Sequence, residues 1–326
     1  EDDSATLPVV ENKPVAEDTA ILRLRDGQLR RMSPRMVDKY LAQPGAKDEV
    51  VETIQTATDE TLYFFTNRGN CFMLDVTRIP ETMKLKDRGS LLTGLIAGLA
   101  DHEHAVALVC VKSDEMAKKG DFLFITKNGQ VKRTAAAEYG IRRARFAAIN
   151  LKGNDELVGM VQVDPEDKDD IILITQLGMA LRFKLDTVSC TGRATAGVRG
   201  IDVGKDDEVR WFEIPKAGDM LFVLSDRGFG KRMLSDDVER QGRAGKGQKL
   251  LPMNKTGETG TQVAVCLNVT GAKSVRVEQK HGHTVLLNMD EIAVERRASK
   301  GQLLVNVLLD DVVQYGALTA ETKDEK

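Results

Sequence analysis

A glycine-rich stretch in the last third of the chain combines a flexible backbone with positive charge. It reads QGRAGKG at 241–247, with two cations, three glycines and no acid. Glycine lets a backbone turn sharply and approach a partner closely, and Arg or Lys beside it can reach a phosphate. Related stretches are RATAG at 193–197 and RASKG at 297–301. The chemistry that these residues could carry is therefore repeated phosphate binding.

The charge of the chain is segregated along its length. The net charge of −3 argues against a nucleic-acid partner, because such domains usually have a basic excess. Acids, however, collect at turns such as 164–170 and 206–208, and the cations collect elsewhere. A near-neutral total can therefore hide a positive belt. We use the name basic loops for the cationic stretches, whose only acid is Asp87: 84–88, 142–152, 193–199, 240–249 and 296–300.

Each basic loop has a plain alternative, since Lys and Arg on a turn are often only solvated. Five loops at similar places in a repeat favour phosphate binding over that alternative. The candidate phosphate contacts are Lys86, Arg88, Arg142, Arg143, Arg145, Arg193, Arg199, Arg240, Arg243, Lys246, Lys249, Arg296, Arg297 and Lys300.

A second set of cations follows turn glycines that recur along the chain, at Gly27, Gly69, Gly129, Gly178, Gly228 and Gly282. Four residues later, the second and sixth copies have Met73 and Leu286. The other four have an arginine there, and we add these to the candidate phosphate contacts together with a neighbouring lysine: Arg31, Arg133, Arg182, Lys231 and Arg232. Pairing with acids on a neighbouring strand is the alternative.

The turn glycines lie between short apolar runs, such as LYFFT at 62–66 and FLFIT at 122–126. Two such runs around a tight turn predict a hairpin, and further strands follow each basic loop. Six copies of about four strands, with a period near 50 residues, predict an all-β, propeller-like fold, because one unit cannot bury its faces alone. Short helical turns are expected at 32–41, 235–240 and 288–295.

We place this domain at 19–316. Residues 1–18 are acidic, with two prolines, which predicts a flexible lead-in, and 317–326 predicts a polar tail. The first residue is Glu1 rather than Met, so we expect a fragment of a longer protein. No apolar run approaches the length of a membrane span.

The remaining reactive side chains favour ordinary roles. The histidines in HEH at 102–104 and HGH at 281–283 could pair on a metal, but no third ligand is near in the sequence. We therefore expect exposed histidines and no metal site. Trp211 and Phe212 are expected to pack inside a blade, and no catalytic constellation is evident. Four cysteines without a CxxC pair predict buried, reduced thiols: Cys71, Cys110, Cys190 and Cys266.

Taken together, these features resemble the C-terminal domain of the A subunit of bacterial type IIA DNA topoisomerases, the group that contains the A subunits of DNA gyrase and of topoisomerase IV (ParC). The resemblance covers nearly the whole chain, about 19–316. It rests on the GxxKR-like turns GQVKR (129–133) and GFGKR (228–232), on FFTNRG (64–69), on GRATAGVRG (192–200) and on the loop at 241–247.

The resemblance implies a six-bladed β-pinwheel, a propeller-like disc of four-stranded blades that exchange strands. Its basic rim would bind and bend duplex DNA without sequence preference and present it for strand passage. The implied partners are double-stranded DNA, the ATPase B subunit, and the rest of the A subunit, in the bacterial cytoplasm at the nucleoid. No cofactor is implied in this domain, although the parent enzyme would use ATP and Mg. Its catalytic tyrosine would lie upstream of this chain.

One departure concerns the choice between the two enzymes. The gyrase family carries QRRGGKG, the GyrA box, at the end of its first blade, where chiral wrapping depends on it. The matching place reads AQPGAKD at 42–48, a degenerate box of Gln43, Gly45 and Lys47. The proline lacks a backbone donor, and the aspartate repels phosphate. KLKDRG at 84–89 also resembles topoisomerase IV of Gram-positive type, so we expect that enzyme, with the gyrase wrapping domain as the alternative.

Two other classes of function stay open on the residues alone. A propeller could be a protein-interaction scaffold. It could also support an enzyme, although no converging polar side chains favour one. A salt titration of binding to random-sequence duplex separates the scaffold from a DNA-binding domain, since phosphate contacts release counterions.

Overall fold

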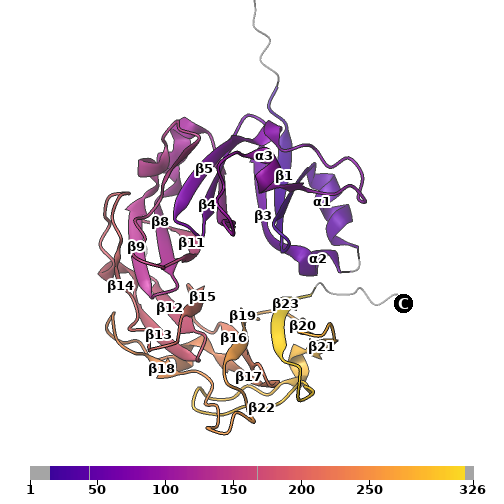
Figure 1. The fold of residues 1–326 in the computed structure, drawn as a ribbon, viewed down its shortest axis with the longest axis vertical. Helices are drawn as coiled ribbons and strands as arrows, with labels where there is room; N and C mark the ends of the chain where they lie inside the picture. Colours follow the sequence, from indigo (N-terminus) through magenta and orange to yellow (C-terminus); the bar gives the residue numbers. More distant parts are fainter. Residues whose placement is uncertain (1–14, 44, 167, 320–326) are drawn as a thin grey trace, which may run out of the picture.

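The computed structural model describes residues 15–43, 45–166 and 168–319, and their strands form six sheets arranged around a centre as the blades of a disc (Figure 1). Every blade begins with an antiparallel hairpin. The hairpins are β1 (Asp18–Leu24) with β2 (Gln28–Met32), β4 (Thr61–Thr66) with β5 (Asn70–Asp75), β8 (Asp121–Thr126) with β9 (Gln130–Ala135), β12 (Asp170–Thr175) with β13 (Met179–Lys184), β16 (Met220–Ser225) with β17 (Phe229–Leu234) and β20 (Ser274–Gln279) with β21 (Thr284–Asn288).

A third strand pairs with the first strand of each hairpin. It lies toward the centre of the disc, as β11, β15 and β19 show in Figure 1. These third strands are β3 (Val50–Ala57), β7 (Ala105–Val111), β11 (Leu157–Val163), β15 (Val209–Glu213), β19 (Val263–Asn268) and β23 (Val313–Leu318).

The fourth strand of each of the first five blades comes from the following copy, and we call it a donated strand. β14, for example, follows the fourth hairpin and pairs with β9 of the third blade, with Val198 opposite Val131. The sixth sheet has three strands among the described residues. The donated strands are β6 (Ser90–Leu91), β10 (Arg145–Ala147), β14 (Val198–Arg199), β18 (Gln248–Lys249) and β22 (Gln302–Leu303). The predicted all-β, six-bladed, strand-exchanged fold is confirmed.

Apolar cores lie between neighbouring blades, because each sheet must bury both faces. Phe65 of the second blade packs edge-to-face against Phe122 and Phe124 of the third, with ring centroids 5.5 and 5.6 Å apart. The remaining face of the first blade is covered by α1 (Pro34–Leu41), which buries Val37 and Tyr40 there.

The first and sixth blades are joined by polar contacts. Arg25 forms an ion pair with Glu278 of β20 at 2.7 Å and lies 3.5 Å from the centroid of the Tyr315 ring on β23. A short helix, α2 (Ala46–Glu49), lies next to β23. The ring of blades is thus completed by charge rather than by a donated strand.

Helical segments are short, and the α-helices are α1, α2 and α3 (Leu92–Leu95). The 3-10 turns are η1 (Val76–Arg78), η2 (Ser113–Lys119), η3 (Ala136–Tyr139), η4 (Leu185–Thr187), η5 (Ser235–Asp237) and η6 (Met289–Glu291). The helical turn predicted at 32–41 is α1, and the other two predicted turns shrink to η5 and η6. None of the described helices is long and apolar enough to cross a membrane.

The ends of the chain are described only in part, and one of the four cysteines departs from prediction. Most of the lead-in predicted at 1–18 and of the tail predicted at 317–326 lies outside the described residues, and the parts that are described include the start of β1 at Asp18 and the end of β23 at Leu318. Cys71, Cys110 and Cys266 are buried, as predicted, whereas Cys190 is exposed. Cys190 follows η4 on the connection to a basic loop, where the chain has left the blade core.

Candidate nucleic-acid interface

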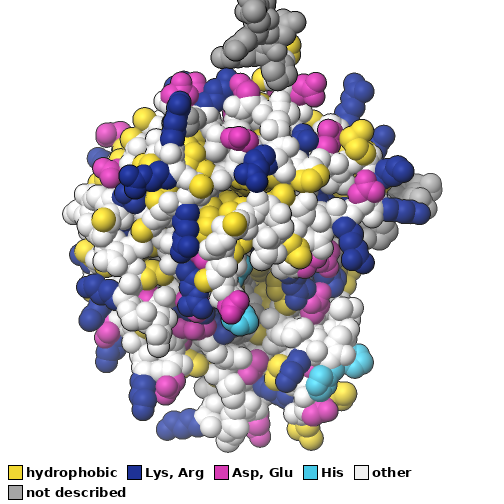
Figure 2. Space-filling model, turned by 45° about the horizontal axis from the view of Figure 1, so that its top comes forward, with side chains coloured by type: hydrophobic (Ala, Val, Ile, Leu, Met, Phe, Trp, Pro, Cys, Tyr) yellow, Lys and Arg dark blue, Asp and Glu magenta, His cyan; other side chains and the backbone are white. Residues whose placement is uncertain are grey.

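Each basic loop contains a donated strand or comes just before one, and this connection places it at the edge of the preceding blade. The loops at 193–199 and 240–249 end in β14 and β18, and the loop at 296–300 leads into β22. These three strands lie at the periphery of the disc in Figure 1. Figure 2 shows Lys and Arg side chains spread along the left edge of the molecule in that view, with acids between them. Loops that are distant in the sequence therefore share one rim.

The glycine that closes each of the last three basic loops is required by the neighbouring blade. Gly247 has a φ of +79°, and a Cβ there would lie 2.4 Å from the carbonyl oxygen of Ala180 on β13. Gly197 and Gly301 also have positive φ, and a Cβ would meet a backbone oxygen at 2.5 and 2.4 Å. The sequence suggested that such glycines approach an anion. The structure instead places these three against a strand.

The arginine four residues before each of these closing glycines reaches back to the preceding loop. Its Nη1 donates to a carbonyl at the end of the previous donated strand: Arg193 to Ala147 (2.6 Å), Arg243 to Arg199 (2.6 Å) and Arg297 to Lys249 (2.9 Å). Each of the three arginines is half-buried. A guanidinium has five N–H donors, so these bonds leave capacity for a phosphate. The links tie successive basic loops into a continuous belt.

The other candidate contacts in the basic loops are exposed. They are Lys86, Arg88, Arg142, Arg143, Arg145, Arg199, Arg240, Lys246, Lys249, Arg296 and Lys300. Some of them already have partners, since Arg199 lies 3.6 Å from Asp202 and Arg240 lies 2.9 Å from the buried Asp170. An exposed pair such as Arg199 with Asp202 is worth less than about 1 kcal/mol, so a phosphate can replace it.

The hairpin arginines have partners within the fold, which favours the alternative of pairing over our assignment of them to phosphate. They lie half-buried or buried at the blade junctions. Their Nε atoms donate to a carboxylate or carbonyl oxygen: Arg31 to Ile79 (2.7 Å), Arg133 to Asp121 (2.6 Å), Arg182 to Asp170 (2.7 Å) and Arg232 to Ile292 (2.7 Å). In the third and fourth copies the acid stands twelve residues before the arginine. That spacing was the signal for the alternative of acid pairing.

Two lysines of the hairpins are fully buried beneath the basic loops. Lys132 donates to the carbonyl of Arg193, and Lys231 donates to the carbonyls of Arg296 and Arg297. Burial lowers the pKa of both ammonium groups to about 8. Lys231, expected to contact phosphate itself, therefore lies behind the loop that carries the exposed cations.

The degenerate box forms helical structure at the end of the first blade. Gln43 and Gly45 are exposed, and Gly45 has a φ of +76°. Lys47 lies within α2. Pro44 lies outside the described residues. The segment that would carry the GyrA box thus contributes a helix next to β23 rather than a donated strand.

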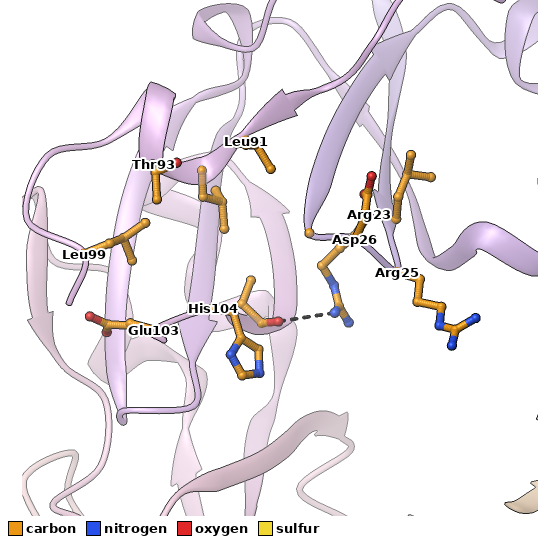
Figure 3. Close-up of a pocket in the computed structure, with 12 residues that line it drawn as sticks. Arg23, Arg25, Asp26, Leu91, Thr93, Leu99, Glu103 and His104 are labelled. Carbon is orange, nitrogen blue, oxygen red and sulfur yellow. Dashed lines mark hydrogen bonds between the residues drawn. The ribbon is translucent and has the colours of Figure 1, made fainter. Parts of the chain in front are cut away.

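A pocket of about 270 Å³ lies between the first and second blades (Figure 3). Arg23 crosses it, with its Nε 3.0 Å from Glu52 and its Nη1 donating to the carbonyl of Ala105 at 3.2 Å. The buried Glu103 accepts a hydrogen bond from Thr66. The charged groups of this pocket therefore hold the two blades together and do not form a pair of nucleophile and base.

The histidines and the two aromatic residues have the predicted surroundings. All four histidines are exposed. Trp211 and Phe212 pack against the interblade cores, as expected. Within the described ranges, no group of three or more His, Cys, Asp or Glu side chains is placed to hold a metal.

Comparison with known proteins agrees with this architecture. A family model described as the DNA gyrase C-terminal domain, a beta-propeller, matches 120–164, 169–216 and 219–260, which lie in the third to fifth copies. The DNA gyrase A protein of Deinococcus deserti is 32% identical over 95% of this chain and 39% of that protein. The corresponding A protein of DNA topoisomerase 4 from Bacillus subtilis is 33% identical over 72% of this chain and 29% of that protein. The chain thus spans well under half the length of these relatives.

Two solved structures share the fold. The C-terminal domain of DNA topoisomerase IV superimposes with a TM-score of 0.81 at 24% identity, covering 94% of each chain. A DNA gyrase A C-terminal domain gives a TM-score of 0.64 at 18% identity, covering 93% of this chain and all of that one. The repeated hairpins, the donated strands and these matches lead to one conclusion: the chain belongs to the family of C-terminal β-propeller domains found in the A subunits of DNA gyrase and topoisomerase IV.

Proposed function

We propose that this chain binds duplex DNA along its basic rim, without preference for base sequence, and bends it. The observation that carries the proposal is that the five basic loops lie along the outer edge of one disc, and that hydrogen bonds link the last four of them in series. Lys and Arg on loops reach phosphates, which every sequence presents alike. A curved row of such contacts suits a bent duplex better than a straight one.

The energy of bending sets how many contacts the rim must make. Bending a short duplex through a right angle costs on the order of several kcal/mol. Each neutralised phosphate releases condensed counterions, and this gain accumulates along the rim. A rim of many weak cationic contacts can therefore offset the elastic cost without reading a single base.

In the full enzyme, the domain would present DNA for strand passage as part of the A subunit of a type IIA topoisomerase. Its partners would be double-stranded DNA, the ATPase B subunit, and the remainder of its own subunit, in the bacterial cytoplasm at the nucleoid. ATP and Mg would act in other parts of that enzyme. We favour topoisomerase IV over gyrase because α2 stands where an open, arginine-rich box would lie. The gyrase alternative is supported by the gyrase relative from Deinococcus deserti.

A salt titration tests the proposal. If about eight phosphates are contacted, log K for random-sequence duplex should fall with log salt at a slope of about −7, since each contact contributes about −0.9. Duplexes of different composition should bind equally, as a control for sequence preference. A duplex affinity that does not change with salt, or the absence of duplex binding, would instead favour the protein-interaction scaffold.

A further inference from the structure

The basic loop at 296–300 is built around a buried ammonium group. Lys231 of β17 is fully buried, and its Nζ donates to the carbonyl oxygens of Arg296 (2.9 Å), Arg297 (2.6 Å) and Ser299. Three carbonyls within four residues thus face one cation in the interior. The Ser299 amide also bonds to the Arg296 carbonyl at 3.0 Å, which closes the segment as a turn.

The orientation of these carbonyls fixes the orientation of the amides that follow them. In a planar trans peptide, the N–H points opposite to the C=O of the preceding residue. The amides of Arg297, Ala298 and Lys300 therefore point away from Lys231. Within the described part of the chain, none of these three N–H groups donates a hydrogen bond. Ala298 and Lys300 are exposed.

A proline leaves one carbonyl of this loop without the backbone donor that its counterparts have. In the two preceding loops, the carbonyl at the matching place accepts a backbone amide from the loop before: Thr195 from Asn150 at 3.1 Å, and Gly245 from Asp202 at 2.8 Å. Ser299 holds that place here, and the donor position is Pro252, which has no N–H. Lys231 supplies the missing donor, and it takes two further carbonyls at the same time.

We propose that Lys231 converts the loop at 296–300 into a backbone site for phosphate, in which the amides of Arg297, Ala298 and Lys300 bind the oxyanion. Successive outward N–H groups form a nest that attracts anions, and the buried ammonium behind them adds positive potential. Lys231 is a positioning residue, since it lies too deep to touch the ligand itself. The inference rests on the proposed function, because DNA would be the source of the phosphate.

The preceding loop provides a natural contrast. The place of Lys231 is taken there by Leu181, which is buried and apolar. The amide of Ala244, which matches Ala298, already donates to the carbonyl of Gly200 at 2.7 Å. That loop therefore offers its side chains, Arg243 and Lys246, and not the Ala244 amide. The two loops would hold DNA by different groups.

The direct test is an amide NMR titration of the whole 326-residue chain, first with a short random-sequence duplex and separately with inorganic phosphate. The chemical shifts of the Arg297, Ala298 and Lys300 amides should change with both ligands. The shift of the Ala244 amide should not change with them, because that amide already donates to the Gly200 carbonyl. Movement with phosphate alone would mean that the nest serves a free anion and not DNA. Duplex binding that leaves all three signals in place would overturn the inference.

Two substitutions distinguish phosphate binding by the backbone nest from phosphate binding by a charged side chain. Lys231→Met keeps the size of the side chain and removes its donors, so affinity for duplex should drop about tenfold, with a nearly unchanged salt slope. Lys300→Ala should instead make the slope shallower by about 0.9. A folded Lys231→Met protein with wild-type affinity would refute the proposal. If that variant does not fold, the wild-type titration still decides. A wild-type chain that binds no duplex would refute the proposed function, while the phosphate arm would still test the nest.

Discussion

Gly247 is one of the most tightly constrained positions of the rim, and its replacement by alanine tests directly how the basic loops are held. The residue has a φ of +79°, which costs a non-glycine residue about 1–2 kcal/mol. The added Cβ would also lie 2.4 Å from the Ala180 oxygen, closer than atoms can approach. The loop must therefore move away from β13.

That movement would disturb the pairing of the donated strand β18. Lys249 pairs with Met179, and the Leu250 amide donates to the Gly178 carbonyl at 2.7 Å. Losing one or two such bonds at about 1 kcal/mol each, added to the strain, gives a destabilisation of about 3 kcal/mol for Gly247→Ala. At roughly 2 °C per kcal/mol for a large domain, the thermal midpoint should fall by about 6 °C.

Gly242→Ala in the same loop is the matched control. No heavy atom lies within 4 Å of the Cβ that this change would add, and the φ of Gly242 is not in the left-handed region. Its melting should stay near that of the wild type, since open surface positions usually change stability by less than about 0.5 kcal/mol. Calorimetry on the two variants decides the matter. Equal midpoints would show that the close approach of the loop to β13 does not constrain it.

Three further outcomes are expected. Arg243→Ala combined with Lys246→Ala should make the salt slope for duplex binding shallower by about 2 with the fold retained by circular dichroism, and an unchanged slope would remove this loop from the interface. Burial, opposed by Glu295 and Asp237 and assisted by the positive charge of Arg297, lowers the pKa of Lys231 from 10.5 to about 8. Between pH 8 and 10.5, Lys231 is mostly protonated in the unfolded chain and mostly neutral in the folded chain. The free energy of unfolding therefore rises with pH in this range. From pH 8 to 9 the wild type should therefore gain roughly 1 kcal/mol over Lys231→Met in urea unfolding, and parallel pH profiles would contradict this. When nicked plasmid is ligated in the presence of saturating domain, its linking number should rise only slightly above that of plasmid ligated without the domain. A large increase, which indicates strong positive wrapping, would favour the gyrase alternative.

The sequence predicted the fold well because its signals are local. A turn glycine between two apolar runs specifies a hairpin wherever it occurs, and six repetitions specify a radial architecture. The exchange of strands between copies followed only from the family resemblance. β14, for example, has two residues, and nothing in Val198–Arg199 indicates that its partner is β9 of another blade.

The candidate site was predicted only in part, because residue type does not give side-chain direction. Lys231 and Lys300 are both lysines near a turn, yet one is buried and the other exposed. A strand position fixes which face a side chain occupies, but which face is covered depends on the neighbouring blade. The acid twelve residues before Arg133 and before Arg182 was the one local sign that these arginines serve the fold.

The donated strands also determine the order in which the molecule can be completed during synthesis. The strand that finishes a blade is encoded after that blade, as β22 at Gln302–Leu303 is for the fifth hairpin at Met220–Leu234. During synthesis, one edge of each new blade therefore stays unpaired until the following copy has left the ribosome. Unpaired strand edges can pair with other chains and promote aggregation. A messenger that ends shortly before the codon for Gln302 would encode neither β22 nor β23, which leaves β17 of the fifth blade and β20 of the sixth each without one partner strand. Its product should aggregate although most of its residues could fold.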